Sequence, residues 1–193
     1  MRYASTIVFS PLLCLAACSW AMPAPKIDWA IAVHGGAGTM SRNAPAARLK
    51  AYEDAMESAV LRGVALLEDG ASALDVCEAV LRSLEDNPMF NAGKGAVYNE
   101  KGEHELDASI MDGRTLACGA VAGVTTTKNP ITLARLVMTD TRHVLLSGPG
   151  ADKFAEEKKV PLVTQDYFHT LAARKAWQDS RAKHSKGTVG CVA

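Results

Sequence analysis

Apolar residues in this chain follow helical spacing in some segments and strand spacing in others, and this alternation restricts the fold most. In residues 45–67 they recur at helical intervals until Asp69-Gly70 ends the pattern. A second helix is predicted over residues 72–84, where Ser72 and Asp75 form the start of a capping box. Shorter apolar runs lie between turn residues elsewhere in the chain. A chain that mixes these elements is expected to form an α/β layered core.

The remaining elements are predicted from the same patterns and from their end signals. Strands are predicted at residues 29–33, 96–98, 105–111, 117–124 and 143–146, and helices at residues 130–137, 151–158 and 167–182. The first of these strands should be buried and should enter a tight glycine loop. Asn129 is expected to be the N-cap of its helix, with Pro130 at the first helical position. The small apolar residues after Gly187 predict a last strand, which needs a partner strand.

Residues 1–21 have the features of a secretory signal peptide. A positive start is followed by a mostly apolar run and then by small residues around Trp20 that suit signal cleavage. We therefore expect a periplasmic or secreted protein. Residues 15–18 also resemble a lipoprotein box, which would anchor the protein to lipid through Cys18. The alternative, a buried strand, is disfavoured because Pro23 and Pro25 separate this run from the next one.

Charge and cysteine content exclude some classes of function. The chain has 21 Lys and Arg residues against 21 Asp and Glu residues, so its formal net charge is zero and nucleic acid is not expected as a partner. After the leader, Cys77, Cys118 and Cys191 remain, without Cys-x-x-Cys spacing. They indicate neither a disulfide framework nor a zinc site, and buried free thiols are the expected state.

Two segments carry residue types that are common in active sites. The loop at residues 34–38 is rich in glycine, but it lacks the patterns of a phosphate-binding loop, and the Gly-x-Ser-x-Gly segment of an esterase does not occur. A polar cluster comprises His104, Glu105, Asp107 and Asp112. Its spacing matches no metal site, so we expect structural hydrogen bonding rather than a catalytic or metal-binding role.

The pair Gly187-Thr188 suggests a nucleophile only when its chemistry is considered. An internal threonine hydroxyl is a poor nucleophile, whereas a threonine at a free N-terminus carries its own base, the α-amine. Glycine before the bond lacks a Cβ atom, so its backbone can adopt the geometry needed for attack on its carbonyl. The polar residues 179–186 that precede the pair would let the severed end move away.

Taken together, seven motifs resemble one known family. They occur in this order: AVHGGAG at residues 32–38, NPxFNAGxG at 87–95, ELDA at 105–108, MDG at 111–113, GAVAGV at 119–124, NPI at 129–131 and GTVG at 187–190. Each motif is weak by itself, but the ordered series is similar to the α-subunit of plant-type asparaginases, also called isoaspartyl peptidases. The resemblance covers about residues 27–193.

The resemblance implies a threonine-type N-terminal nucleophile hydrolase with a four-layer αββα sandwich, incomplete in this chain. The precursor would cut itself between Gly187 and Thr188, so that residues 22–187 form the α-subunit and residues 188–193 begin the β-subunit. Thr188 would then hydrolyse asparagine and β-aspartyl dipeptides through an acyl-enzyme. The family also implies a dimer of αβ units.

Further site residues are implied by the same resemblance. Asn91 would help to order the nucleophile, and no organic cofactor is expected. A structural sodium ion would be held by backbone carbonyls of a nearby loop. These carbonyls would belong to Leu84, Glu85, Asn87, Phe90, Ala92 and Lys94.

Two alternatives remain open at this point. Glycosylasparaginases share the nucleophile but usually place Asp before the threonine, where this chain has Gly187. The chain could instead be an inactive remnant or an interaction protein, because the family's substrate-binding Arg and Asp and its oxyanion Thr-Gly pair would lie beyond residue 193. The sequence does not decide between free asparagine and isoaspartyl peptides as substrate.

Overall fold

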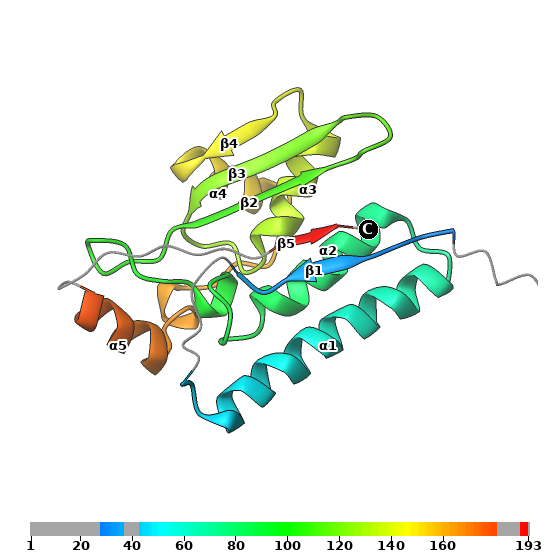
Figure 1. The fold of residues 1–193 in the computed structure, drawn as a ribbon. Coiled ribbons are helices and arrows are strands. Elements are labelled where there is room, and N and C mark those ends of the chain that lie inside the picture. Colours follow the sequence, from blue (N-terminus) through cyan, green and yellow to red (C-terminus); the bar gives the residue numbers. More distant parts are fainter. Residues whose placement is uncertain (1–27, 37–42, 181–189, 193) are drawn as a thin grey trace, which may run out of the picture.

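A computed structural model describes residues 28–36, 43–180 and 190–192 (Figure 1). The predicted leader with Cys18, and the predicted cleavage site at Gly187 and Thr188, lie outside the described residues. Within the described residues, no helix is both long and apolar enough to cross a lipid bilayer. The mixture of helices and sheets confirms the predicted α/β class.

Two long helices form one half of the molecule. They are α1 (Ala46–Glu68) and α2 (Ala73–Glu85), which match the predicted helices closely and pack against each other. The capping prediction at α2 is confirmed, because the Ser72 hydroxyl accepts a hydrogen bond from the Asp75 backbone nitrogen at 3.2 Å. Such a bond satisfies an amide group that the first turn of a helix leaves without a partner.

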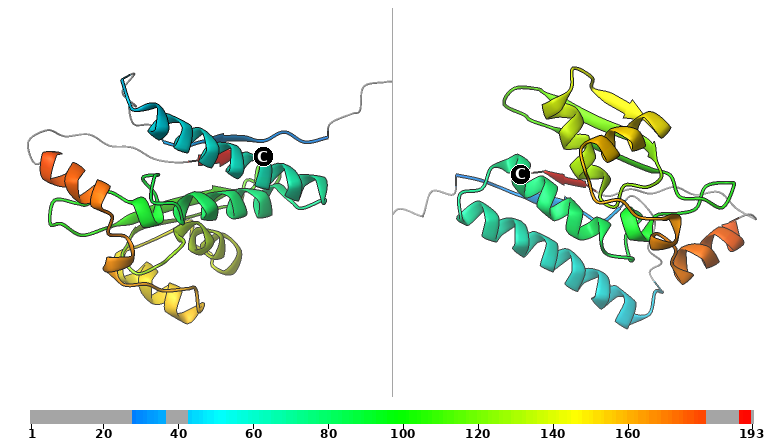
Figure 2. Two further views of the ribbon diagram at one scale, coloured as in Figure 1. Left: turned by 90° about the horizontal axis from the view of Figure 1, so that it is seen from below. Right: turned by 180° about the vertical axis from the view of Figure 1, so that it is seen from behind.

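A three-stranded sheet with two helices forms the other half. Strand β2 (Leu106–Met111) pairs antiparallel with β3 (Cys118–Val124), and β3 pairs parallel with β4 (Leu145–Ser147). The parallel connection runs through α3 (Pro130–Asp140), and α4 (Gly148–Glu157) follows β4. Both helices pack on β3 and cover one face of the sheet (Figure 2).

The two ends of the described chain meet in a second, two-stranded sheet. Strand β1 (Ala32–His34) pairs antiparallel with β5 (Gly190–Val192), with Val33 opposite Cys191. Strand β1 lies on α1 and β5 lies on α2. The predicted last strand is therefore confirmed over residues 190–192. The prediction of a buried first strand was wrong, because Ala32 and His34 are exposed and only Val33 is half-buried.

One other predicted element was wrong, and another begins later than predicted. Residues 96–98 are not a strand, because they continue from the 3-10 helix η1 (Gly93–Gly95) and the Val97 backbone nitrogen donates to the Asn91 side chain. The helix predicted over residues 167–182 is divided into the 3-10 helix η2 (Gln165–Tyr167) and α5 (Leu171–Ser180). The division follows from burial of the Phe168 side chain and from Thr170, whose hydroxyl accepts a hydrogen bond from the Ala173 nitrogen at 3.0 Å.

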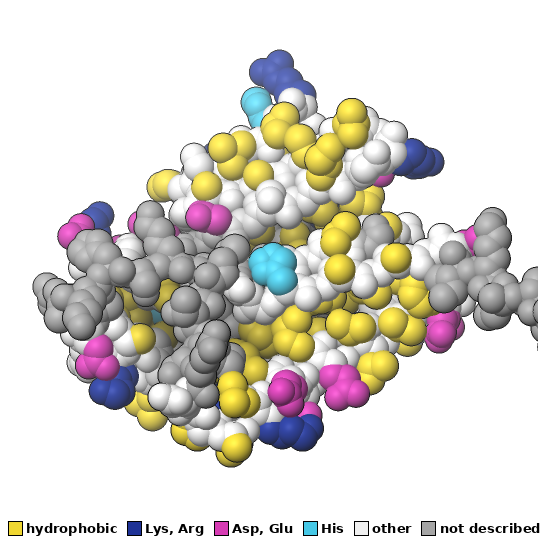
Figure 3. Space-filling view, in the orientation of Figure 1, with side chains coloured by type: hydrophobic (Ala, Val, Ile, Leu, Met, Phe, Trp, Pro, Cys, Tyr) yellow, Lys and Arg dark blue, Asp and Glu magenta, His cyan; other side chains and the backbone are white. Residues whose placement is uncertain are grey.

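The hydrophobic core joins the two halves. Its fully buried side chains include Val80 on α2, Val121 and Val124 on β3, and Leu133 and Val137 on α3. Hydrophobic side chains also gather along the seam between the β2–β3–β4 sheet and the α1–α2 half on the face shown in Figure 3. The site described next lies between these halves.

Candidate active site

A cleft of about 760 Å³ lies between the start of β5, the loop after α2 and the strands β2 and β3. From the loop it is lined by Asn91, from β2 by Asp107 and Ser109, and from β5 by Gly190 and Cys191. Segments from the middle of the chain and the strand at its C-terminal end therefore meet at one cavity. The cleft brings together Asn91, predicted to order the nucleophile, and the strand that follows the predicted nucleophile in the sequence.

Asn91 is held in place by the chain that follows it. Its side-chain oxygen Oδ1 accepts a hydrogen bond from the Val97 backbone nitrogen at 2.9 Å, which closes the loop from residue 91 to residue 97. Two glycines of this loop pack closely against backbone carbonyls. A Cβ atom on Gly93 would lie 2.3 Å from the Glu85 carbonyl oxygen, and one on Gly95 would lie 2.1 Å from the Phe90 carbonyl oxygen. Only glycine fits such contacts with backbone atoms.

Strand β5 approaches the cleft beside the predicted glycine loop. A Cβ atom on Gly190 would lie 2.3 Å from Nε2 of His34, its partner across the β1–β5 ladder. The first and the last of the seven sequence motifs are therefore neighbours in space. The glycine loop motif supplies the strand that pairs with β5, and no phosphate site is needed to explain it.

The predicted sodium ligands run from the last turn of α2 through the following loop to η1. The carbonyls of Leu84, Asn87 and Ala92 each accept a backbone hydrogen bond, from Asn87, Phe90 and Gly95 respectively. A carbonyl oxygen has a second lone pair, so these bonds leave each oxygen able to coordinate an ion. The Glu85 and Phe90 carbonyls face glycines at distances that a Cβ atom would fill. The sodium site therefore stays a prediction.

The Glu85 side chain has a role that the sequence pattern did not reveal. It is buried, and its Oε1 atom accepts a hydrogen bond from the Ile131 backbone nitrogen at 3.0 Å, so it caps the first turn of α3. Burial raises the pKa of Glu85 to about 8, although the Ile131 bond acts in the opposite direction. Asn129 is the N-cap residue of α3 and Pro130 its first helical residue, as predicted, but the Asn129 side chain makes no capping hydrogen bond. Its amide nitrogen donates to Asp86 at 3.2 Å.

Two carboxylates of the polar cluster form the kind of structural hydrogen bond that was predicted. Asp107 accepts a hydrogen bond from the Gly123 nitrogen at 2.8 Å, and Asp112 accepts one from the Arg114 nitrogen at 2.9 Å. Among residues 28–36, 43–180 and 190–192, no group of three or more His, Cys, Asp or Glu side chains could hold a metal ion. Glu105 and Asp107 line the cleft together, as their alternate positions predict.

His104 is fully buried and connects this cluster to the segment before the predicted cleavage site. Its Nδ1 atom lies 3.2 Å from the Val97 carbonyl, so this nitrogen carries the hydrogen, and Nε2 accepts from Nδ1 of His169 at 2.9 Å. Burial and the neighbouring His169 lower the pKa of His104. Trp177 of α5 donates to the Asn99 carbonyl at 2.9 Å. These contacts hold α5 against the loop that follows η1.

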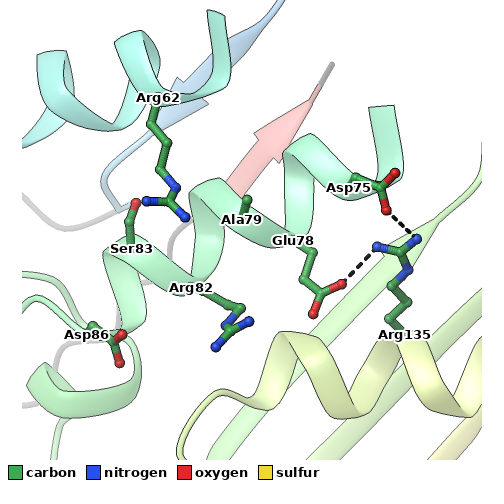
Figure 4. Close-up of a pocket in the computed structure, with 8 residues that line it drawn as sticks. All are labelled: Arg62, Asp75, Glu78, Ala79, Arg82, Ser83, Asp86 and Arg135. Carbon is green, nitrogen blue, oxygen red and sulfur yellow. Dashed lines mark hydrogen bonds and ion pairs between the residues drawn. The ribbon is translucent and has the colours of Figure 1, made fainter. Parts of the chain in front are cut away.

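A second hollow, of about 560 Å³, is lined by charged side chains of α1, α2 and α3 (Figure 4). Arg135 of α3 forms ion pairs with Asp75 at 2.6 Å and with Glu78 at 2.8 Å. Arg62 of α1 and Arg82 of α2 also point into this hollow. The ion pairs of this hollow connect α2 to α3, so we interpret its charged residues as a structural contact between the helices.

Comparison with known proteins identifies the class and then the family. The family model described as "Asparaginase" matches residues 27–193. An Arabidopsis thaliana protein named probable isoaspartyl peptidase/L-asparaginase 2 is 48% identical over 142 residues, 74% of this chain and 43% of its own length. The isoaspartyl peptidase of Escherichia coli is 44% identical over 179 residues, 84% of this chain and 56% of its own length. A plant-type L-asparaginase of Pyrococcus abyssi is 47% identical over 161 residues, 83% of this chain and 50% of its own length.

These similarities and the mixed helix and sheet structure define an N-terminal nucleophile hydrolase fold. The chain belongs to the asparaginase family, as the motif series predicts. It spans about half the length of the curated relatives it matches.

Proposed function

We propose that this chain supplies the α-subunit and the first β-subunit residues of an isoaspartyl peptidase/L-asparaginase. The observation that carries the proposal is the cleft, which Asn91 and the start of β5 line together. Thr188 precedes Gly190 by two residues, and two extended residues span at most about 7 Å. The sequence therefore limits how far the proposed nucleophile can be from that cleft.

The proposed reaction uses one hydroxyl twice. In the precursor, the Thr188 hydroxyl attacks the Gly187 carbonyl, and later hydrolysis of the ester frees the Thr188 α-amine. In the mature enzyme, this amine takes the proton as the hydroxyl attacks the side-chain carbonyl of the substrate. The C–N bond then breaks, and ammonia leaves from asparagine or the second residue's amine leaves from an isoaspartyl dipeptide. Water cleaves the resulting ester and releases aspartate.

The proposal includes the complete four-layer sandwich and its further components. In the described residues, helices cover one face of the β2–β3–β4 sheet, and β1 and β5 lie on α1 and α2. This arrangement supports an αββα sandwich that the rest of a family-length protein would complete. The carbonyl oxygens of Leu84, Glu85, Asn87, Phe90, Ala92 and Lys94 would hold a sodium ion, because hard cations prefer oxygen ligands. Export, the lipid anchor at Cys18 and a dimer of αβ units stay predictions.

The nucleophile is tested in a precursor that continues this chain to the length of its relatives. Thr188→Ala should abolish both chain cleavage and release of aspartate, because one hydroxyl serves both steps. Thr188→Ser keeps the hydroxyl and should retain part of both activities. Cleavage is followed on a denaturing gel, and product release is measured with asparagine and with an isoaspartyl dipeptide. Two-chain processing in the alanine variant would refute the assignment.

A further measurement separates the enzyme from an inactive remnant. Residues 1–193 alone should neither cleave efficiently nor release ammonia from asparagine, whereas the longer precursor should do both. Removal of one oxyanion donor typically costs about a hundredfold to a thousandfold in rate. A longer precursor that folds but stays uncleaved and inactive would support the remnant instead.

A further inference from the structure

Two cysteines far apart in the sequence lie against each other beside the cleft. Cys77 is on α2 and Cys191 is on β5, 114 residues further along the chain, and the Cys77 sulfur lies 3.8 Å from the Cys191 carbonyl oxygen. The Cys77 thiol is also close enough to raise the pKa of the Cys191 thiol. Both side chains are half-buried and pack on the hydrophobic core. Packing of α2 against β5 is what brings them together.

The position of the pair matters because of what lies between its members. The Gly187-Thr188 bond falls between Cys77 and Cys191 in the sequence. A covalent link between these two sulfurs would therefore join the segments on either side of that bond. It would also attach β5 to α2 within three residues of Thr188. Cys118 lies on β3, away from both α2 and β5 in the sequence, and serves as an internal control.

We propose that Cys77 and Cys191 form a disulfide when the protein meets a disulfide oxidant such as glutathione disulfide. Contact with Cys77 and burial raise the pKa of the Cys191 thiol, which favours Cys77 as the first thiol to react. The Cys77 thiolate attacks one glutathione sulfur, and a glutathione thiolate leaves. Cys191 then attacks the Cys77 sulfur of this mixed disulfide and displaces the second glutathione. The two protein protons end on the two glutathione thiols.

The consequence for the enzyme rests on the function proposed above. After cleavage before Thr188, the disulfide would keep the two chains covalently joined. It would also hold β5 in its register beside β1 and at the edge of the cleft. The pairing itself does not require cleavage, because both cysteines already lie in contact in the single chain.

Peptide mapping tests the pairing in the longer precursor. The folded protein is treated with glutathione disulfide, blocked with an alkylating reagent, and digested with trypsin without reduction. Trypsin should release Cys77 in the peptide of residues 63–82, Cys118 in residues 115–128, and Cys191 in a peptide that follows Lys186. The expected product is the first peptide linked to the third, lighter than their sum by two hydrogens. Reduction before digestion should remove it.

The same linked peptide reports cleavage separately from pairing. It begins at Gly187 in uncut protein and at Thr188 in processed protein, so failure of self-cleavage changes its mass but does not remove the link. Cys118→Ser should leave the linked peptide in full yield, whereas Cys77→Ser or Cys191→Ser should abolish it. The proposal is overturned if the two cysteines end as separate glutathione adducts, or if either pairs mainly with Cys118.

Discussion

Gly119 marks the closest approach of α3 to the sheet, and replacing it with alanine is the sharpest test of the packing. A Cβ atom on Gly119 would lie 2.2 Å from the Ala134 carbonyl oxygen and 2.5 Å from the Met138 nitrogen. Both are backbone atoms of α3, so no side-chain rotation can relieve the contact. The helix would have to move away from β3.

The expected cost is large for so small a substitution. Overpacking a well-packed core typically costs about 1–3 kcal/mol. Because the clash here is with backbone, we expect the upper end of that range or beyond. Alanine also reduces the freedom of the unfolded chain, which offsets about 0.4–1 kcal/mol. The net loss for Gly119→Ala should therefore be about 2–3 kcal/mol.

Gly113, in the loop between β2 and β3, provides a matched control. Gly113 has nothing within 4 Å of its Cβ position and is not among the glycines with positive φ. Gly113→Ala should leave the free energy of unfolding unchanged or raise it by about 0.5 kcal/mol. Both variants are compared in the longer precursor by urea unfolding followed by circular dichroism. A difference between them of less than about 1 kcal/mol would refute the close packing of α3 on β3.

Three further predictions concern charge. The pKa of His104 is lowered in the folded state, so the unfolded chain binds more protons at acidic pH. The free energy of unfolding should therefore fall as the pH drops below about 6.5, and this group should contribute at most about 1.4 kcal/mol per pH unit. His104→Gln should flatten that part of the stability curve, and an unchanged slope would contradict the interpretation. Arg135→Met keeps the apolar stem but removes the ion pairs with Asp75 and Glu78, and should cost about 1–2 kcal/mol in low salt and less in high salt, measured by urea unfolding. Exchange of sodium for a large organic cation should lower the melting temperature of the precursor, because an ion bound only by the native state stabilises it by mass action; identical melting curves would count against the ion.

The elements that were predicted well are those whose signals are local. The start of α2 depends on Ser72 and Asp75, which are three residues apart, and the sequence alone is enough to recognise such a cap. The start of α3 depends instead on Glu85, which is 46 residues away from Ile131 in the sequence. Asn129 is the N-cap residue, as its type and position predict, but its side chain makes no capping hydrogen bond and its amide donates to Asp86. The local sequence therefore identifies where α3 begins, but not the distant side chain that caps its first turn.

In the candidate site, too, the features that could be predicted are those with a local sequence signal. The position of Asn91 in a glycine-containing loop could be predicted, because Gly93 and Gly95 make the motif recognisable. The contact of Cys77 with Cys191 could not, because the sequence spacing of the cysteines suggested only separate buried thiols. Their meeting depends on the packing of β5 against α2, which no local pattern encodes.

The pairing of β1 with β5 also explains why two short motifs of the family lie at opposite ends of this chain. Strand β5 contains three residues, too few to be stable by itself in water. It is held by β1 along one edge and by α2 beneath it, and the His34 side chain fills the space above Gly190. These supports all come from residues before the predicted cleavage site. Cutting the chain before Thr188 would therefore leave the strand after the cut in contact with the groups that position it.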